Sequence, residues 1–376
     1  MPRYSEEITA LLRSLLWNET LTIDTTVLMQ PGLWQEACRY QLDNMLAVWA
    51  LNKGLDIYSP AVQKQRIFIT LQRKQSQNKL LADLVALLRQ HDIELVLLKG
   101  YGLALLYENP DLRDYSDVDI YVGEQNYPRT VQIVHSHYHD AYWFSQSEGV
   151  KHFIMVLDGN MERIVELHRV TIEFSCARAN RAWQQFTRDE MQRTRTIQVN
   201  GLSVSVPSPT YNAIYVFLHA WHHFVSAGVG LRQMADWMLT LQDTNINAET
   251  LRDLLQQLRL YEIWQTFGWV LVNRFGLNRE KFPFYLDGCS KRGERLYRQL
   301  LIDGHCGRSA RFLLLGRRMY RFPFSRPEHG RLRQKFYTFC RLTFNAFQLG
   351  KFFPKYAFYE YAGIISRQLS AQRSNL

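Results

Sequence analysis

Two aspartates separated by one residue, Asp117 and Asp119, point most directly to chemistry in this sequence. They lie in the stretch SDVDIYV, where polar and apolar residues alternate as in a β-strand. Because side chains two apart on a strand project to the same face, both carboxylates point the same way and repel each other. A divalent cation relieves that repulsion, and Mg²⁺ is typically bound through one or two carboxylates plus substrate phosphates. The pattern therefore predicts a Mg²⁺ site, with a solvated polar strand face as the alternative.

A third carboxylate is expected from a neighbouring strand. Glu166 lies in the alternating run RIVELHRV, and His168 shares its predicted face. We interpret His168 as a histidine satisfied within the strand rather than as a ligand, and Glu166 has a surface position on an edge strand as its alternative. Glu173 and Glu162 are rival candidates for the third carboxylate. Three carboxylates on adjacent strands can hold two metal ions, the arrangement used for in-line displacement at phosphorus.

Upstream of these acids, a short apolar run, residues 93–98, predicts a buried strand that ends at Lys99-Gly100. Residues 101–107 then predict a short helix. A helix N-terminus offers backbone N–H groups and a positive dipole end to a triphosphate, and glycine permits close approach. Lys99 either binds a phosphate or caps the strand, and Arg113 is placed to neutralise a phosphate oxygen.

The elements around this region change character along the chain. Residues 1–90 have apolar residues at helical spacing, residues 91–207 contain the strand-like runs, and the helical period returns from residue 208. Within the middle region, residues 125–137 predict a helix, and residues 194–206 predict a hairpin that turns at Asn200-Gly201. Helices, then a mixed sheet, then helices predict an α+β fold. We divide the chain into regions 1–90, 91–207, 208–289 and 290–376.

The second helical region carries further polar candidates. His219, His222 and His223 are spaced to share one helix face, which can ligate zinc, although packing or phosphate contact is the favoured interpretation. Arg232 and Asp236 lie one turn apart. They predict either an ordinary intrahelical ion pair or a role for Arg232 at the site.

The formal net charge of +10 is unevenly distributed. Residues 290–376 contain 18 Lys and Arg against 4 Asp and Glu, whereas the rest of the chain is slightly acidic. This basic, aromatic segment predicts a helical cap packed on the body, a membrane-surface helix, or a groove for an anionic polymer. The charge is therefore evidence about a C-terminal anionic partner rather than about the whole chain.

The remaining composition indicates the class of protein. Five dispersed cysteines without a C-x-x-C pair argue against a disulfide framework and against a cysteine-built zinc site. The N-terminus lacks the apolar core of a signal peptide, and no stretch reaches the ~18 apolar residues of a spanning helix. We therefore expect no transmembrane segment and a cytoplasmic location.

Together these features resemble an uncharacterised branch of the nucleotidyltransferase superfamily, which has the polymerase-β-like fold. The resemblance covers roughly residues 63–241 and rests on a set of short motifs: Lys99-Gly100, Arg113, Asp117-Val118-Asp119, Glu166-Leu167-His168, and the helical stretch His219 to Trp237. It implies a small mixed sheet that bears the metal site, with flanking helical regions closing over the nucleotide. One departure is that the wider superfamily usually has G-G or G-S where this chain has Lys99-Gly100.

The activity that the resemblance implies is Mg²⁺-dependent transfer of a nucleotidyl group from an NTP to a hydroxyl acceptor. Two Mg²⁺ ions would be held by Asp117, Asp119 and Glu166. Lys99, Gly100, Arg113 and Arg232 would contact the nucleotide. Two alternatives remain: a catalytically silent member that binds a nucleotide or a partner, and an anionic-surface binder acting through the basic C-terminus. Proteins, tRNA, antibiotics and sugars are all acceptors in this superfamily, and no feature of the sequence selects one.

Overall fold

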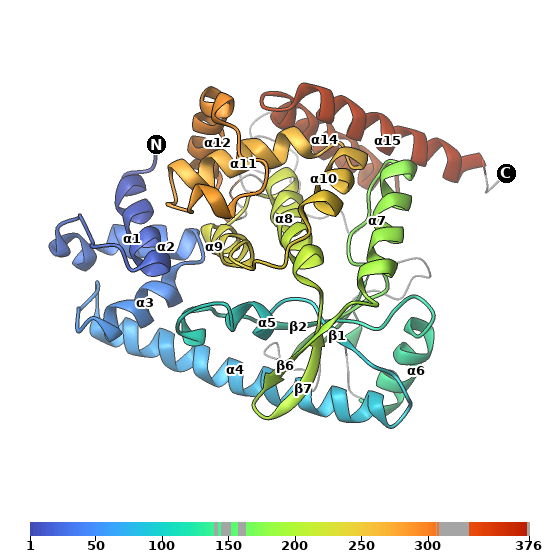
Figure 1. Cartoon of the computed structure of the whole chain (residues 1–376), viewed down its shortest axis with the longest axis horizontal. Helices are drawn as coiled ribbons and strands as arrows, with labels where there is room; N and C mark the ends of the chain where they lie inside the picture. The colour runs from blue at the N-terminus through green and yellow to red at the C-terminus, as the bar shows by residue number, and fades with distance from the viewer. Residues whose placement is uncertain (139–141, 144–151, 157–162, 306, 308–330, 374–376) are drawn as a thin grey trace.

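A computed structural model of the 376-residue chain describes residues 1–138, 142–143, 152–156, 163–305, 307 and 331–373. In the described residues one mixed sheet of seven strands lies between two groups of helices (Figure 1). α4 runs along one side of the sheet, and α8 and α9 lie on the other side, with α14 and α15 farther out (Figure 1). The predicted α+β class, a small mixed sheet flanked by N- and C-terminal helices, is confirmed.

The sheet has the strand order β3-β4-β5-β2-β1-β7-β6, so the two strands at its centre, β2 and β1, are flanked by β5 and β7. β2 is parallel to β5 and antiparallel to β1, and β1 is parallel to β7. The remaining neighbours are antiparallel. The strands are β1 (Val96–Leu97), β2 (Asp117–Tyr121), β3 (Tyr142–Trp143), β4 (His152–Val156), β5 (Ile164–His168), β6 (Arg195–Val199) and β7 (Leu202–Val206).

The predicted hairpin is present between β6 and β7. Asn200 and Gly201 have φ values of 50° and 80°. Positive φ at both central residues is what a two-residue type I′ turn requires, and Asn-Gly is the pair that adopts it most readily. The strand pair Val199 and Leu202 closes the turn.

Two predicted strands are shorter in the structure. Of the apolar run at residues 93–98, only Val96 and Leu97 pair within the sheet, although Ile93 and Leu95 are buried beside them. β5 ends at His168, so the following residues 169–174 leave the strand direction. Burial explains their apolar character, and strand pairing does not.

The N-terminal helices are α1 (Ser5–Trp17), α2 (Pro31–Arg39), α3 (Asp43–Asn52) and the 30-residue α4 (Pro60–Arg89). α4 begins at a recognisable cap, because the Ser59 hydroxyl accepts from the backbone N–H of Val62 and Pro60 occupies the first helical turn. Its second half buries Leu80, Leu84 and Leu88 against the sheet. Its first half is polar and contacts the loop that leads into β2.

The helices within and after the sheet complete the fold. α8 begins at Ser208, whose hydroxyl accepts from the backbone N–H of Tyr211, and it is buried on nearly every side. The bounds are α5 (Tyr101–Ala104), α6 (Tyr127–His137), α7 (Ala177–Glu190), α8 (Pro209–Ser226), α9 (Leu231–Thr240), α10 (Ala248–Gln257), α11 (Tyr261–Asn273), α12 (Ser290–Asp303), α14 (Arg331–Gly350) and α15 (Pro354–Arg373).

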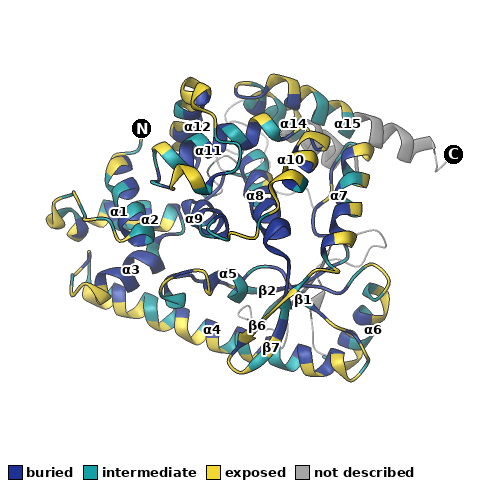
Figure 2. Ribbon diagram, viewed as in Figure 1, coloured by how far each residue is buried: buried dark blue, intermediate teal, exposed yellow. Residues whose placement is uncertain are grey.

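Two hydrophobic cores hold these elements together. The smaller core lies between the sheet, α4 and α6. The larger core contains residues of α1 to α3, of α7 to α12, and of the α14–α15 junction. Figure 2 shows this burial as dark blue along α8 and α9. Apolar packing therefore joins the N-terminal and C-terminal helical regions, and the division into four regions at the predicted boundaries stays a prediction.

The described part of the C-terminal segment packs on the body. The rings of Phe353 and Tyr356 lie edge-on to Trp221 of α8, with centroids 5.8 and 5.5 Å apart. Phe352, Phe353 and Tyr356 are all buried. These contacts agree with the interpretation of this segment as a helical cap. Among the helices that the structure describes, none combines the length and the apolar character needed to cross a membrane.

Candidate functional site

The two central parallel strands, β2 and β5, have faces of opposite chemistry. One face belongs to the smaller core under α4 and α6 and carries Val118, Ile120, Val165 and Leu167. The other face is turned toward α8 and carries Asp117, Asp119, Glu166 and His168. The strand period alone separates these two sets, because neighbouring residues point to opposite faces.

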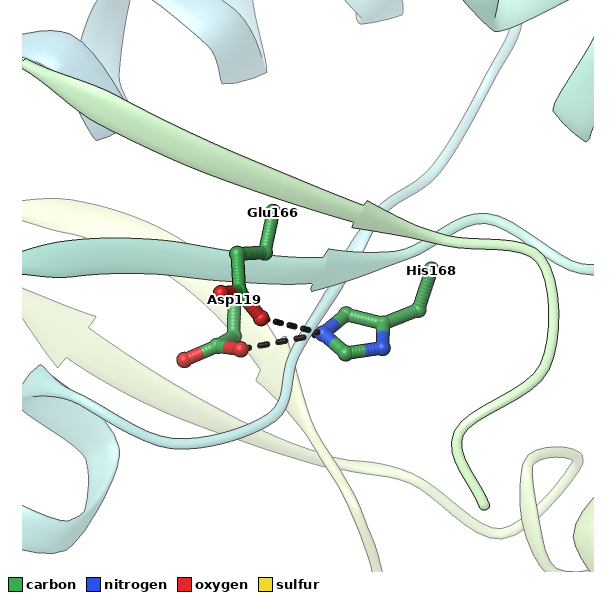
Figure 3. A group of neighbouring side chains, drawn as sticks. All are labelled: Asp119, Glu166 and His168. Atoms are coloured by element: carbon green, nitrogen blue, oxygen red, sulfur yellow. Dashed lines mark hydrogen bonds and ion pairs between the residues drawn. The ribbon is translucent and has the colours of Figure 1, made fainter. Parts of the chain in front are cut away.

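Three side chains on the polar face come within reach of one another (Figure 3). The parallel register pairs Asp119 directly with Glu166. His168 Nε2 lies 2.9 Å from Asp119 Oδ1 and 3.5 Å from Glu166 Oε2. The structure thus brings the predicted third carboxylate beside Asp119 and confirms that Glu166 and His168 share a face. It also places His168 inside the cluster, a position that the interpretation as an ordinary strand histidine did not anticipate.

Lys99 supplies positive charge to the same cluster. Its Nζ lies 2.9 Å from Asp119 Oδ1 and 3.3 Å from His219 Nε2, and its side chain is 13% exposed. Burial opposes ionisation of Asp119, but the Lys99 ammonium and the contact with His168 hold the pKa of this carboxyl well below its usual range. Burial likewise opposes the charged form of Lys99, yet Asp119 raises the pKa of Lys99 above its ordinary value. Both groups are therefore ionised at neutral pH.

The donor set fits a divalent cation. Asp119 is 1% exposed, and its second oxygen, Oδ2, is buried with no hydrogen-bond partner. A buried carboxylate oxygen without a partner costs free energy that a bound cation can recover. Ligand atoms of Asp119, Glu166 and His168 lie within 4.8 Å of one another, which is compatible with one shared ion. Two carboxylates and one imidazole suit Mn²⁺ or Zn²⁺ as well as Mg²⁺.

Asp117, the first residue of β2, stands at the edge of this cluster. It is half-buried, and burial followed by the negative charge of Asp119 raises the pKa of Asp117 to about 6. Glu166 acts in the same direction, whereas Lys99 and Arg232 oppose it. These electrostatic neighbours place Asp117 on the same side of the sheet as the other carboxylates.

The loop that delivers Asp117 is held from several sides. Asn44 of α3 donates to the carbonyl oxygens of Asp111 and Leu112, and Gln77 of α4 donates to that of Ser116. Three cations of α4 bind carboxylates of the same loop: Arg66 and Arg73 bind Asp114, and Lys74 binds Asp111. The polar half of α4 therefore fixes the entry into β2.

Arg113 lies at the centre of this loop and has its partners inside the protein. It is 5% exposed, and it pairs through two nitrogens with both carboxylate oxygens of Asp236, at 2.7 and 2.9 Å. Its third nitrogen donates to Gly100 O at 3.2 Å. The phosphate contact predicted for Arg113 stays a prediction, and this geometry argues against it because all three nitrogens are engaged. Arg113 instead links the Gly100 turn to α9.

The Lys99-Gly100 turn has a conformation that requires glycine. Gly100 has φ 60° and ψ −118°, a region that residues with a Cβ rarely enter. α5 that follows is only four residues long and ends at Ala104, shorter than the predicted 101–107. So short a helix offers little macrodipole. Binding of the nucleotide at Gly100 therefore remains a prediction that depends on the turn itself.

α8 and α9 close over the polar face. Tyr215 and His219, one turn apart on α8, approach Lys99, and burial raises the pKa of Tyr215. The rings of His219 and His223 lie 4.6 Å apart, whereas His222 is exposed and lines a pocket on the other side of α8. The predicted shared face of three histidines is therefore wrong for His222, which rules out the three-histidine zinc site.

Arg232 of α9 reaches the edge of the site. Its Nη1 donates to the carbonyl oxygen of Asp114 at 2.8 Å, and its Nε is buried with no hydrogen-bond partner. Asp236, the alternative partner weighed for Arg232, accepts from Arg113 and from Tyr107. The structure thus favours the site-facing interpretation of Arg232 over an intrahelical ion pair.

The two rival carboxylates are not part of this cluster as described. Glu173 follows the end of β5, is exposed, and lines a pocket of about 250 Å³ between α8, α14 and α15, together with His222 and Glu360. Glu162 lies outside the described residues.

Sequence reasoning missed the partners that hold the site in place. Asp236, Tyr107 and Asp114 belong to no local motif, and Asp236 lies 123 residues from Arg113. One signal was present: Arg113 and Asp114 precede the D-x-D motif directly, and adjacent opposite charges before a buried strand indicate an ion-pair network.

Comparison with known proteins agrees with this geometry. A family profile described as uncharacterised nucleotidyltransferase matches residues 54–276, more than half of the chain. No curated protein matches the chain. A solved structure similar to it, an antigenic nucleotidyltransferase-like protein from Paracoccidioides brasiliensis, is 17% identical and covers 51% of this chain and 90% of that one. Its TM-score of 0.31 is too low to support a conclusion. By the profile match, the chain belongs to the family of uncharacterised nucleotidyltransferases.

Proposed function

We propose that this protein transfers a nucleotidyl group from an NTP to a hydroxyl acceptor in a Mg²⁺-dependent reaction. The observation that carries the proposal is the buried, unpartnered Oδ2 of Asp119, set beside Glu166 by the β2–β5 register. A surface polar strand has no reason to bury an ionised carboxylate in this way. Family membership supports the reaction class.

Asp117, Asp119 and Glu166 would hold two Mg²⁺ ions, with His168 able to complete the coordination of one of them. When bound, these ions would neutralise charge on the triphosphate and on the attacking and leaving oxygens. Lys99 and Arg232 are the side-chain cations nearest the carboxylates, and they would orient the phosphates. Arg113 would act through the Gly100 turn, as a positioning residue.

The reaction balances simply. The acceptor oxygen forms a bond to the α-phosphorus, the bond from that phosphorus to the bridging oxygen breaks, and pyrophosphate leaves. The hydroxyl proton is released to solvent. Fixed charges near the phosphorus would supply most of the rate enhancement, because they are already oriented in the folded protein.

The test combines a substrate screen with one matched pair of variants. The wild type is incubated with each α-labelled NTP, Mg²⁺ and fractions of a cell lysate as acceptors, and both pyrophosphate release and label transfer are measured. Asp119→Asn should lower the rate by at least ~10³-fold, as expected for loss of a metal ligand and of fixed charge at phosphorus. Asp253→Asn, at an exposed position of α10, should have the wild-type rate. Equal rates for Asp119→Asn and the wild type would contradict the proposal.

A second candidate is a nucleotide-binding protein without transfer activity. It is favoured by the Lys99–Asp119 ion pair, which engages a proposed metal ligand. This candidate predicts that NTPs raise the midpoint of thermal unfolding while no pyrophosphate is released with any NTP or acceptor fraction. Release of pyrophosphate that requires Asp119 would exclude it.

A further inference from the structure

Lys99 and the proposed metal share one carboxylate. Lys99 Nζ lies 2.9 Å from Asp119 Oδ1, on the same oxygen that His168 Nε2 approaches at 2.9 Å. Both partners of the ion pair are largely buried, with side chains 13% and 1% exposed. In this arrangement the ammonium already neutralises the carboxylate that a cation would need most.

A divalent ion on Asp119, Glu166 and His168 would lie close to that ammonium. All three ligand atoms are within 4.8 Å of one another, and Nζ is in contact with one of them. Like charges at such separations repel strongly in a buried site, where water screens them poorly. The metal and the ammonium therefore compete for Asp119.

The surroundings of Lys99 offer the ammonium a second position. Lys99 directly precedes the Gly100 turn, the proposed contact of the triphosphate, and its Nζ also reaches His219 Nε2 of α8 at 3.3 Å. A triphosphate at this turn would present several negative oxygens to a long, flexible side chain. It would attract the ammonium and compensate its departure from Asp119.

We infer that Lys99 is an internal counter-ion that weakens metal binding at Asp119 until the triphosphate of the substrate draws it away. Metal and nucleotide then bind cooperatively, because each favours the same position of Lys99. This inference rests on the proposed function, and it goes further by naming how the metal site is regulated. It also explains why a basic residue stands where the wider superfamily usually has a small one.

The chain contains a matched control for this idea. Lys74 of α4 is a second buried lysine, with a side chain 7% exposed, and it is paired with Asp111 at 2.7 Å. Asp111 is half exposed and belongs to the loop before β2 rather than to the carboxylate cluster. Removal of either lysine deletes a buried ammonium, but only Lys99 contacts a proposed metal ligand.

The experiment measures Mn²⁺ affinity by the loss of the free-ion electron spin resonance signal. The wild type, Lys99→Met and Lys74→Met are titrated with and without an α,β-methylene NTP analogue. Lys99→Met should bind Mn²⁺ alone at least ~10-fold more tightly than the wild type, because one repulsive charge is gone. Lys74→Met should match the wild type. The analogue should enhance Mn²⁺ binding several-fold more in the wild type than in Lys99→Met, and metal–analogue complexes in solution cancel from this ratio.

Each outcome has a definite meaning. Unchanged or weaker Mn²⁺ binding by Lys99→Met would overturn the inference and leave Lys99 as part of the coordination environment. If Lys99→Met does not fold, Lys99→Gln is titrated in its place, and the same criterion applies. Asp119→Asn separates the two proposals: loss of Mn²⁺ binding in that variant upholds the metal site whatever Lys99 does. Retention of wild-type Mn²⁺ affinity by Asp119→Asn overturns the proposed site itself.

Discussion

The two faces of β2 and β5 divide stability and chemistry within the same ten residues. On one face Val118, Ile120, Val165 and Leu167 are buried and pack under α4. On the other face, carboxylates, an imidazole and an ammonium contact one another beneath α8. Because neighbouring residues on a strand alternate between faces, the rigid apolar side fixes the spacing of the polar side.

A second comparison concerns how the buried charges are satisfied. Arg113 and Asp236 use all their charged nitrogens and oxygens on partners within the protein. Asp119 Oδ2 and Arg232 Nε, by contrast, are buried with no hydrogen-bond partner. Complete pairing is typical of a structural element, whereas unpaired buried atoms in a polar cluster indicate a position for a ligand. The ion pair supports the site, and the cluster is the site.

The largest effect on stability should come from the ion pair. In Arg113→Met the Asp236 carboxylate stays buried and loses two charged hydrogen bonds, which should cost about 3–5 kcal/mol of unfolding free energy. Urea denaturation measures this loss. Arg279→Met removes an exposed pair with Asp287 and should cost less than about 1 kcal/mol. A small effect at Arg113 would mean that the pair does not hold the Gly100 turn.

The apolar face comes next. Ile120 is fully buried, and Ile120→Ala should cost about 2–5 kcal/mol of unfolding free energy through lost burial and a cavity. The folded fraction should retain the Mn²⁺ affinity of the wild type, because the polar face is unchanged. Leu286→Ala, at a position 46% exposed, is the control and should have little effect on stability. Loss of Mn²⁺ affinity in folded Ile120→Ala would show that the two faces are not separable.

Much of the fold follows from the sequence because its signals are local. Asn200-Gly201 predicts its hairpin since few other pairs adopt positive φ twice, and Ser208 with Pro209 predicts the start of α8. The apolar run at residues 93–98 misled the strand length. Ile93 is buried without pairing in the sheet, and an apolar pattern reports burial rather than hydrogen bonding.

The candidate site follows from the sequence only in part. The spacing of Asp117 and Asp119 predicts that both face one side, since the strand period is fixed. The register that sets Asp119 beside Glu166 depends on strands separated by α6, β3 and β4, and no local pattern encodes it. The same holds for Arg113, which looks like a free cation in the sequence until its distant partner Asp236 is known.

A smaller effect tests the helix that covers the polar face. Burial, followed by His222 and Lys99, lowers the pKa of His223 to about 4, below its ordinary 6.5. Its folded form thus resists protonation, and the stability present above pH 6.5 is lost as the pH falls toward 4. Because His223 is only partly buried, we expect its contribution to be about 2 kcal/mol. His223→Gln should flatten the unfolding free energy between pH 7 and 4. His137→Gln, at an exposed position of α6, should leave the profile unchanged.

Removal of a charge from the polar face should have the opposite sign to removal of an apolar side chain. In Asp117→Asn one of three neighbouring carboxylates becomes neutral, and less repulsion should raise the unfolding free energy of the metal-free protein by about 1 kcal/mol. Thermal unfolding in EDTA measures this gain, and nucleotidyl transfer should fall in the same variant. A loss of stability in EDTA would show that Asp117 makes a net favourable contact in the absence of metal.

The smallest effect on stability is expected at the basic surface outside both faces. Lys351 and Lys355 are exposed at the junction of α14 and α15, next to aromatic side chains that are buried in the larger core. Deletion of the segment would expose Phe353 and Tyr356, so charge reversal is the cleaner test of a C-terminal anionic partner. The double variant Lys351→Glu, Lys355→Glu should change the unfolding free energy by less than about 0.5 kcal/mol.

Its binding behaviour should change much more. If this surface binds an anionic polymer, fluorescence anisotropy with a labelled single-stranded oligonucleotide should show weaker binding by the double variant. The slope of log K against log salt should also be shallower by about two, one for each lost phosphate contact. Wild-type affinity with an unchanged salt slope would exclude these two lysines from the contact. The excess of basic residues in 290–376 would then require another explanation, while the comparison of the two strand faces would stand unaffected, since neither lysine touches it.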